Sequence, residues 1–358
     1  MSFTIPDISY RPPSTSYRPA IGLIGCGGIT SSHLSAYRDC GLDVVALCDL
    51  DIDRAVARRD EYYPDADVYT DHDAVLARDD IEVVDVATPP IGRPSIIADA
   101  IDAGVHVLSQ KPFVLDVAVG ERLVARADDA NVVLAVNQNG RWSPHWRYCL
   151  EATNQGYLGD VQSVNLAVHW DHDWIAETPF DGIDHAILYD FAIHWFDFLA
   201  TLLADRDPRR VAAATAHAPS QTATPPLLGQ TIVAYEGCQA TIALDGHTKH
   251  GSFDRTVLSG TEATVVSCGP NLNDQTVTIH CNGARCSPPI EGQWFTDGFA
   301  GSMMALLAAI AAGASPEHAA SSNLRSLELC FAAIAAAEDD EPVVPGDVQR
   351  LRGQGWAD

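Results

Sequence analysis

The stretch Ile21-Gly-Leu-Ile-Gly-Cys-Gly-Gly-Ile-Thr30 decides the fold of this chain. Its first four residues have the apolar character of a short strand, and the residues that follow have the pattern of a helix. Gly25 suits the tight turn between the two, and Gly27 allows a pyrophosphate to approach the backbone. Gly28 and Ile29 lead into the helix, whose first N–H groups attract anions. The pattern predicts a nucleotide site, although glycines in such a turn are often purely structural.

The next strand strengthens this interpretation. Residues 44–48 are apolar, and Asp49 follows them, 24 residues after Gly25. A carboxylate at this strand end accepts the ribose hydroxyls of an adenosine and repels a 2′-phosphate. NAD is therefore predicted in preference to NADP. The alternative is that Asp49 is an ordinary surface acid in an aspartate-rich chain.

Strand and helix patterns then alternate along the first part of the chain. Strand patterns cover residues 81–87, 105–108 and 132–136, and helical patterns cover residues 95–103 and 117–127. This alternation is typical of an α/β fold with a doubly wound parallel sheet, the Rossmann arrangement, whose ligands lie at the carboxyl ends of the strands. Thr88-Pro89 and Gln110-Lys111 follow two of these strand ends. We expect both pairs to face the crevice of the glycine loop.

The second part of the chain has a different pattern. Short strands separated by turn residues indicate a largely antiparallel open sheet, over residues 163–169, 231–235, 239–244, 255–259, 263–266 and 276–280. One face of this sheet is expected to pack on the helix that holds Asp190 and on a helix over 299–312. The predicted domains are an extended N-terminal arm (1–19), a Rossmann domain (20–141) and an α+β domain (142–358).

The composition limits the partners of the protein. A count gives two lysines against twenty arginines and 36 aspartates against twelve glutamates, with a formal net charge of −26. So acidic a surface argues against nucleic acid and anionic membranes as charge-driven partners. The aspartate excess favours a salt-adapted host, whereas a high-GC genome would explain the loss of lysine alone. Because Lys111 is one of two lysines that remain, we expect an ammonium to be needed there.

The cysteines and the apolar segments indicate a cytoplasmic protein. Nine cysteines are scattered without any C-x-x-C pair, which is typical of reduced thiols and predicts neither disulfides nor a zinc site. The arm has no apolar core of a signal peptide. The longest apolar stretch near the C-terminus, residues 303–312, is too short to span a bilayer. No membrane contact is therefore expected.

Asp190 and His194 are four residues apart, so on a helix they would share one face. Oxidation of a secondary alcohol needs a base for the hydroxyl proton, and histidine suits this role because its ordinary pKa lies near neutrality. A lone histidine on an aromatic-rich helix is more often a packing residue. The motifs elsewhere in the chain decide between the two.

Taken in order, these motifs resemble the Gfo/Idh/MocA family of sugar and cyclitol oxidoreductases from about residue 20 to about residue 345. The stretches that carry the resemblance are Gly25-Cys-Gly-Gly-Ile29, Asp49, Ala87-Thr-Pro-Pro90, Ala103-Gly-Val-His-Val-Leu108, Gln110-Lys-Pro112, Asn137-Gln-Asn-Gly-Arg-Trp142, Gly156-Tyr-Leu-Gly-Asp-Val161 and Asp190-Phe-Ala-Ile-His-Trp-Phe-Asp197. The resemblance implies NAD as cofactor, a small polyhydroxylated substrate and a homodimer or homotetramer. It also implies cofactor contacts from Gln110, Lys111 and Asn137, beside those of the glycine loop, Asp49, Thr88 and Pro89.

The resemblance further implies three catalytic roles. His194 would be the general base, Asp190 would accept a hydrogen bond from substrate or from His194, and Lys111 would stabilise the developing alkoxide. Two positions depart from the family pattern. Gln110 replaces the usual glutamate before the lysine, and Arg93 stands where a histidine commonly follows the Thr-Pro turn, which puts any contact carried over from that position in doubt.

A further cluster, His169-Trp-Asp-His-Asp-Trp174, has side chains that could bind a metal or a sugar. Alternating residues of a strand point to opposite faces, and no partner group has metal-site spacing, so no metal is predicted. We expect a substrate-facing loop instead, with Trp170 or Trp174 stacking on a sugar ring and His172 contacting its hydroxyls.

Two other functions use the same residues. The first is a redox-neutral enzyme that keeps NAD bound and achieves elimination, epimerisation or glycoside cleavage through transient oxidation. The second is a non-catalytic NAD-binding sensor. Net reduction of added NAD distinguishes a dehydrogenase from both.

Overall fold

The computed structural model describes residues 8–351 of the chain. The first seven residues of the predicted arm lie outside the described residues. By packing, the chain forms two compact units that are interleaved in sequence. The N-terminal unit comprises Pro12–Trp142 and Phe295–Leu324, and the C-terminal unit comprises, among the described residues, 8–11, 143–294 and 325–351. The linear division at residue 141 remains a prediction about folding domains.

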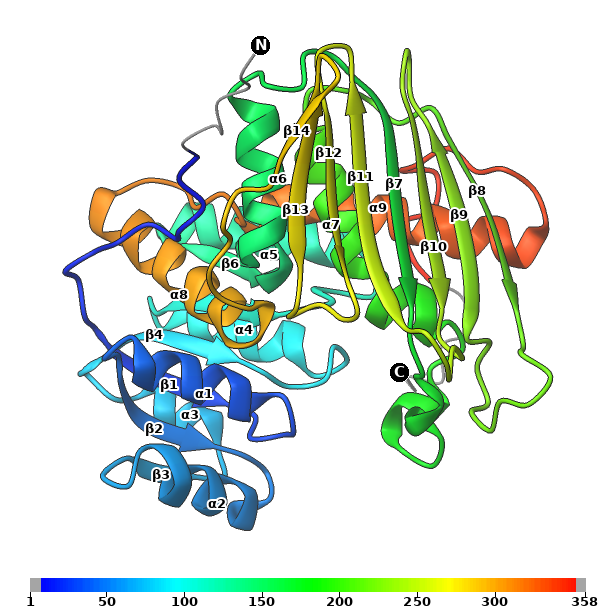
Figure 1. Ribbon diagram of the computed structural model, residues 1–358. Helices are drawn as coiled ribbons and strands as arrows, with labels where there is room; N and C mark the ends of the chain where they lie inside the picture. Colours follow the sequence, from blue (N-terminus) through cyan, green and yellow to red (C-terminus); the bar gives the residue numbers. More distant parts are fainter. Residues whose placement is uncertain (1–7, 352–358) are drawn as a thin grey trace. The chain divides into compact units, whose positions relative to one another are not determined.

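The N-terminal unit is built on a six-stranded sheet in the order β3-β2-β1-β4-β5-β6, and all its described strand pairs are parallel. Figure 1 labels β1 to β4 and β6 of this sheet. The strands are β1 (Ala20–Ile24), β2 (Asp43–Cys48), β3 (Asp67–Tyr69), β4 (Ile81–Val86), β5 (His106–Gln110) and β6 (Leu134–Asn137). The helices between them are α1 (Thr30–Asp39), α2 (Ile52–Tyr62), α3 (His72–Leu76), α4 (Arg93–Asp102) and α5 (Val117–Ala130). The predicted Rossmann arrangement is confirmed, with its switch point between β1 and β4.

Helix α8 (Trp294–Ala312) contributes to the core of the N-terminal unit from Phe295 onward. Phe299, Met303 and Leu306 are buried in one cluster with Leu23 and Leu34. The expectation that residues 299–312 pack on the second sheet was wrong, because an apolar helix does not encode which core it enters. By length and hydropathy this 19-residue helix could cross a membrane, but 56% of its apolar window is buried. Packing in the core accounts for its apolar character.

The C-terminal unit contains an eight-stranded sheet in the order β14-β13-β12-β11-β7-β10-β9-β8. The strands are β7 (Val161–His169), β8 (Arg210–Ala216), β9 (Leu228–Ala234), β10 (Gln239–Asp245), β11 (Phe253–Gly260), β12 (Thr264–Gly269), β13 (Thr276–Cys281) and β14 (Ala284–Cys286). Among the described strands of this second sheet, only the β10–β7 pair is parallel, so the predicted largely antiparallel sheet is confirmed.

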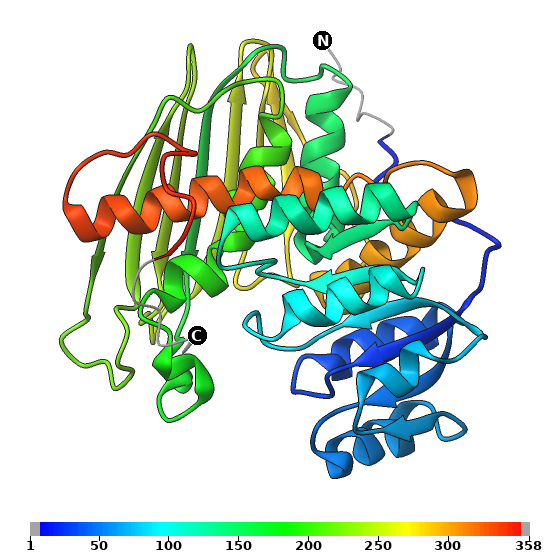
Figure 2. The ribbon, with the colours of Figure 1, turned by 180° about the vertical axis from the view of Figure 1, so that it is seen from behind.

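Helices cover one face of this sheet, as the reverse view shows for α9 (Figure 2). They are α6 (Pro144–Asn154), α7 (Ile193–Leu202) and α9 (Ala320–Asp339), which joins this unit from Arg325 onward. Short helical turns are η1 (Asn139–Trp142) in the N-terminal unit, and η2 (Asp173–Ile175), η3 (Pro179–Gly182) and η4 (Ile187–Phe191) in the C-terminal unit. On β7, Val164, Leu166 and Val168 are buried in alternation, as expected for a sheet with one covered face.

An ionisable side chain lies on this covered face. Asp254 of β11 is fully buried, and neither carboxylate oxygen has a hydrogen-bond partner among the residues described. Its neighbour on the same face, Thr256, accepts a hydrogen bond from Nε1 of Trp146 at 2.9 Å. Burial raises the pKa of Asp254 to about 7. The folded protein therefore favours the protonated acid, whereas the unfolded chain releases this proton near pH 4.

This difference in pKa predicts that Asp254→Asn raises the free energy of unfolding by an amount that depends on pH. Because the folded pKa is raised, folding stability falls as the pH rises from about 4 to about 7, by about 4 kcal/mol at most. The amide cannot ionise, so the variant should be more stable than wild type at pH 8, and the gain should shrink steadily toward pH 5. Urea unfolding at pH 5 and pH 8 measures this change in stability, and Asp205→Asn, at an exposed aspartate, is the control. An equal effect at both values would contradict the assignment.

Candidate active site

The glycine loop lies against the end of β4 in the N-terminal unit. Gly25 has φ +97°, and a Cβ there would lie 2.8 Å from the carbonyl carbon of Ala87 and 3.0 Å from N of Thr88. Only glycine tolerates both the backbone conformation and this approach. The N–H of Gly25 donates to the carbonyl of Cys48 at 2.7 Å. The loop is therefore held to the ends of the two strands that flank β1.

Asp49 lies at the end of β2, beside the glycine loop. Its Oδ2 accepts the N–H of Cys26 at 2.7 Å, and its Oδ1 accepts the N–H of Asp51 at 2.9 Å. The carboxylate therefore lies next to the loop, as a contact with an adenosine ribose requires. Arg58, which sequence reasoning missed, donates to the carbonyl of Gly27 at 3.1 Å.

The start of α1 fits a dinucleotide pyrophosphate. A Cβ added at Gly27 or Gly28 would meet no atom within 4 Å, so the backbone there is open. The helix begins after Ile29, which provides no side-chain cap for the first-turn N–H groups. The N–H groups of Thr30 and Ser31 make long bonds, to the carbonyls of Gly27 at 3.3 Å and Gly28 at 3.4 Å. N–H groups at a helix start attract anions, and the helix dipole adds to the attraction.

Arg93, the first residue of α4, is 1% exposed and binds backbone carbonyls of two loops. Its guanidinium donates to the carbonyl of Thr88 from Nε at 3.0 Å and also from Nη2. Nη1 donates to the carbonyl of Gln110 at 2.6 Å and to that of Pro112. The Thr88-Pro89 turn and the Gln110-Lys111 turn are thus joined through one side chain, which sequence reasoning treated only as a departure.

Lys111 is half-buried and directly follows β5, and its peptide bond to Pro112 is cis. Strands β5 and β6 pair Gln110 with Asn137, which places both next to one another at the carboxyl edge. Nε2 of Gln110 lies 2.8 Å from Nε2 of His33. The structure therefore brings the predicted cofactor residues of the N-terminal unit to one edge of its sheet.

Asp190 and His194 belong to the C-terminal unit, but not to one regular helix. Asp190 lies in the π-helical turn η4, and His194 lies in the first turn of α7, which begins at Ile193. The prediction of a single α-helix was wrong at this point, because an apolar periodicity does not reveal an inserted residue. π-Helical turns occur frequently at functional sites. Both side chains are only partly buried, as substrate contact requires.

The imidazole of His194 lies next to two tryptophan rings. Its ring centroid lies 5.4 Å from that of Trp294 and 6.4 Å from that of Trp195, both edge-on. Trp294 in turn packs on Trp146 with centroids 4.7 Å apart. These apolar neighbours fix the position of the imidazole and lower the local dielectric around it. Trp294 and Trp195 were not predicted as site residues.

The predicted substrate loop forms an aromatic cluster next to Asp190. The rings of Trp170 and His172 stack at 5.1 Å, and His172 contacts Phe191 edge-on at 4.2 Å. Burial lowers the pKa of His172 to about 4, although the carboxylates of Asp171 and Asp190 oppose the shift. His172 is therefore neutral near pH 7. Trp174 is 56% exposed, so part of its side chain is accessible from solvent.

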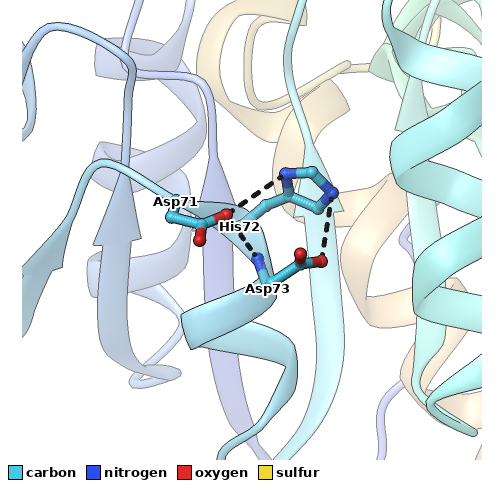
Figure 3. A group of neighbouring side chains, drawn as sticks. All are labelled: Asp71, His72 and Asp73. Carbon is cyan, nitrogen blue, oxygen red and sulfur yellow. Dashed lines mark hydrogen bonds and ion pairs between the residues drawn. The ribbon is translucent and has the colours of Figure 1, made fainter.

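A carboxylate–imidazole group lies at the start of α3 (Figure 3). Asp71 caps the helix by accepting the N–H of Asp73 at 3.1 Å. Nε2 of His72 lies 3.0 Å from Asp99 on α4 and 3.6 Å from Asp73. Helix capping and a link between two helices account for this geometry.

Two family models match the chain. One, described as an oxidoreductase family with an NAD-binding Rossmann fold, matches residues 20–138. The other, described as the Gfo/Idh/MocA C-terminal domain, matches residues 146–266.

Relatives and solved structures agree with these matches. A D-apiose dehydrogenase of Paraburkholderia graminis is 33% identical over 203 residues, which are 56% of this chain and 53% of that protein. The chain thus matches about half the length of this relative. An inositol 2-dehydrogenase of Rhizobium meliloti is 25% identical over 90% of this chain and 98% of that protein. An oxidoreductase structure from Agrobacterium radiobacter, in complex with NAD+, L-tartaric acid and magnesium, has a TM-score of 0.82 at 19% identity and covers 92% of this chain and 99% of its own. This last match shows the fold alone.

Proposed function

Because the chain belongs to the Gfo/Idh/MocA oxidoreductase family and carries its NAD-binding Rossmann domain, we propose that it is an NAD-dependent dehydrogenase of a sugar, sugar derivative or cyclitol. The observation that carries the proposal is the carboxyl edge of the parallel sheet, where the open glycine loop, Asp49 and the Lys111 turn each follow the end of a strand. Asp49 supports NAD over NADP, because its carboxylate would repel a 2′-phosphate.

We assign the chemistry to Lys111, Asp190 and His194. NAD, when bound, supplies the carbon that accepts a hydride. His194 takes the hydroxyl proton of the substrate, and the Lys111 ammonium donates a hydrogen bond to the same oxygen as negative charge develops. Asp190 accepts a hydrogen bond from a neighbouring substrate hydroxyl or from His194. In the reverse direction His194 returns the proton.

The substrate class follows from two kinds of support. The relatives are named for a branched sugar and a cyclitol, D-apiose and inositol. In this chain, Trp174 is exposed and lies beside Phe180, with ring centroids 5.9 Å apart. His172 lies close enough to Asp190 for the two side chains to interact electrostatically. Aromatic faces bind the apolar faces of sugar rings, and the polar side chains bind hydroxyls. We therefore propose Trp170, His172 and Trp174 as substrate contacts.

The redox-neutral enzyme is the second candidate function, since the same residues support transient oxidation with retained NAD. A non-catalytic sensor is disfavoured, because the residues of catalytic type are all present at Lys111, Asp190 and His194.

The experiment that tests the proposal is absorbance of reduced nicotinamide with NAD and, separately, NADP across aldoses, D-apiose, inositols and glycosides. Reduction of added NAD by one class of polyol supports the dehydrogenase. Product formation without net NAD reduction supports the redox-neutral enzyme, and NAD binding without turnover supports the sensor. The same assay without molar salt tests the salt-adapted interpretation, which predicts a loss of activity.

We further propose a cytoplasmic homodimer or homotetramer. On the uncovered face of the eight-stranded sheet, the exposed residues of β9 are Gln230 and Ile232, and Ile232 is 53% exposed. Exposed apolar positions of this kind support association through the sheet. Light scattering should give two or four times the mass of the chain, and a monomer would contradict the proposal.

A further inference from the structure

The backbone N–H of Lys111 begins a buried chain of hydrogen bonds. It donates to Oε1 of Gln110 at 2.7 Å, which orients the amide, because the oxygen must face this donor. The amide nitrogen then faces Nε2 of His33 at 2.8 Å. Nδ2 of Asn137 lies 3.5 Å from the same ring nitrogen. Amide nitrogens donate and do not accept, so Nε2 of His33 is an unprotonated acceptor.

The contacts of the other ring nitrogen, Nδ1, determine the tautomer of His33. Nδ1 of His33 lies 2.6 Å from Oδ2 of Asp85, and the hydroxyl of Tyr37 donates to the same oxygen at 2.6 Å. Burial, and secondarily Asp85, raises the pKa of Tyr37 well above its ordinary value, so the hydroxyl keeps its proton. Because a carboxylate only accepts, Nδ1 carries the proton of the imidazole. His33 is thus neutral, and the direction of each hydrogen bond from Lys111 to Asp85 is determined.

Arg93 also holds this stretch of backbone. Its guanidinium binds the carbonyls of Gln110 and Pro112, the residues on either side of Lys111. Arg93, Gln110 and His33 are each at least 95% buried. A guanidinium offers five donors in a rigid fork, which an ammonium on a flexible stem cannot reproduce. Buried side chains thus hold the peptide group before the Lys111 Cα and, one peptide group beyond Lys111, the carbonyl of Pro112.

We propose that Arg93, Gln110 and neutral His33 are positioning residues, which aim the Lys111 ammonium by holding its backbone. This inference rests on the proposed function of Lys111 in hydride transfer. The hydrogen-bond directions also explain why an amide suits position 110. An amide can accept from the Lys111 N–H and donate to a neutral His33 at the same time, whereas a carboxylate at position 110 could only accept. A glutamate there would require a proton on Nε2 and hence an imidazolium.

Arg93→Lys tests the positioning by Arg93. The variant keeps the positive charge but cannot bind the carbonyls of Gln110, Pro112 and Thr88 together. A displacement of about 1 Å in a catalytic group costs roughly 10²-fold in rate, so kcat should fall by that order while the KM for the polyol stays within about threefold. The primary deuterium isotope effect on kcat should rise as hydride transfer becomes limiting. Exposed Arg126→Lys is the matched control. Wild-type kcat in Arg93→Lys would overturn the proposal.

Gln110→Glu tests the network without requiring activity. In ¹⁵N spectra of histidine-labelled protein, His33 of wild type should show a protonated Nδ1 and an unprotonated Nε2, with its signals assigned by their loss in His33→Gln. In Gln110→Glu both nitrogens should be protonated at the same pH. A protonated Nε2 in wild type, or an unchanged Nε2 in the variant, would overturn the proposal. If wild type oxidises no polyol, the proposed function fails, whereas these spectra still decide the network.

Discussion

Lys111→Met is expected to lower kcat by roughly 10²–10³-fold, as the removal of one preorganised donor to a developing oxyanion does. The thioether keeps the length and the apolar stem of the side chain but has no N–H to donate. NAD binding should change far less, because the glycine loop and Asp49 hold the cofactor. Stopped-flow measurement of NAD reduction, together with NAD titration by protein fluorescence, separates the two effects.

The chain provides its own control for this variant. Lys249 is its other lysine, with a side chain 48% exposed and 3.8 Å from Asp173. Lys249→Met removes an ammonium with the same chemistry, and its kcat should stay within about twofold of wild type. Equal losses in the two variants would show a general effect of charge, and an unchanged Lys111→Met protein would remove Lys111 from the mechanism.

His194→Asn is expected to lower kcat by roughly 10²–10⁴-fold, the range for loss of a positioned general base. The amide is close in shape to the imidazole and can still hydrogen-bond a hydroxyl, but it cannot take its proton. The decisive readout is the pH profile of kcat/KM. Wild type should lose activity as the pH falls and the base becomes protonated, and the variant should lack this acid limb.

The matched control is His280→Asn, since His280 is an exposed imidazole on β13 of the same unit. It should keep both the rate and the acid limb of wild type. An acid limb that persists unchanged in His194→Asn would assign the base to another group.

The parallel sheet was predictable because its strands are continuous apolar runs that alternate with helices and end in chemically distinctive residues. The strands that were missed lack these signals. β8 reads Arg-Val-Ala-Ala-Ala-Thr-Ala over Arg210–Ala216, and alanine runs favour helices. β3 (Asp67–Tyr69) has only three residues, too few for any periodicity. Helix α8 was predicted over part of its length, but its partner core depends on tertiary packing.

The residues of the candidate site also separate into those that the sequence predicts and those that only the folded structure reveals. The glycine loop, Asp49 and Lys111 follow strand ends, so topology alone predicted their common edge. The buried hydrogen bonds that connect Lys111 to Gln110, His33 and Asp85 were not predictable, because His33 and Asp85 are 52 residues apart and meet only in the folded chain. One signal was available, since Asp85 is a carboxylate inside the apolar strand β4 and therefore requires a buried partner. Its partner could not be named from the sequence.

If this chain transfers hydride from a polyol carbon to NAD, the transferred atom can be followed by isotope labelling. The experiment uses the polyol identified in the absorbance assay, deuterated at its reacting carbon, with mass spectrometry of the nicotinamide. We expect one deuterium on the reduced NAD released by wild type, and a loss of this transfer in Lys111→Met and His194→Asn. Unlabelled NAD alongside a converted substrate that retains its deuterium would contradict it.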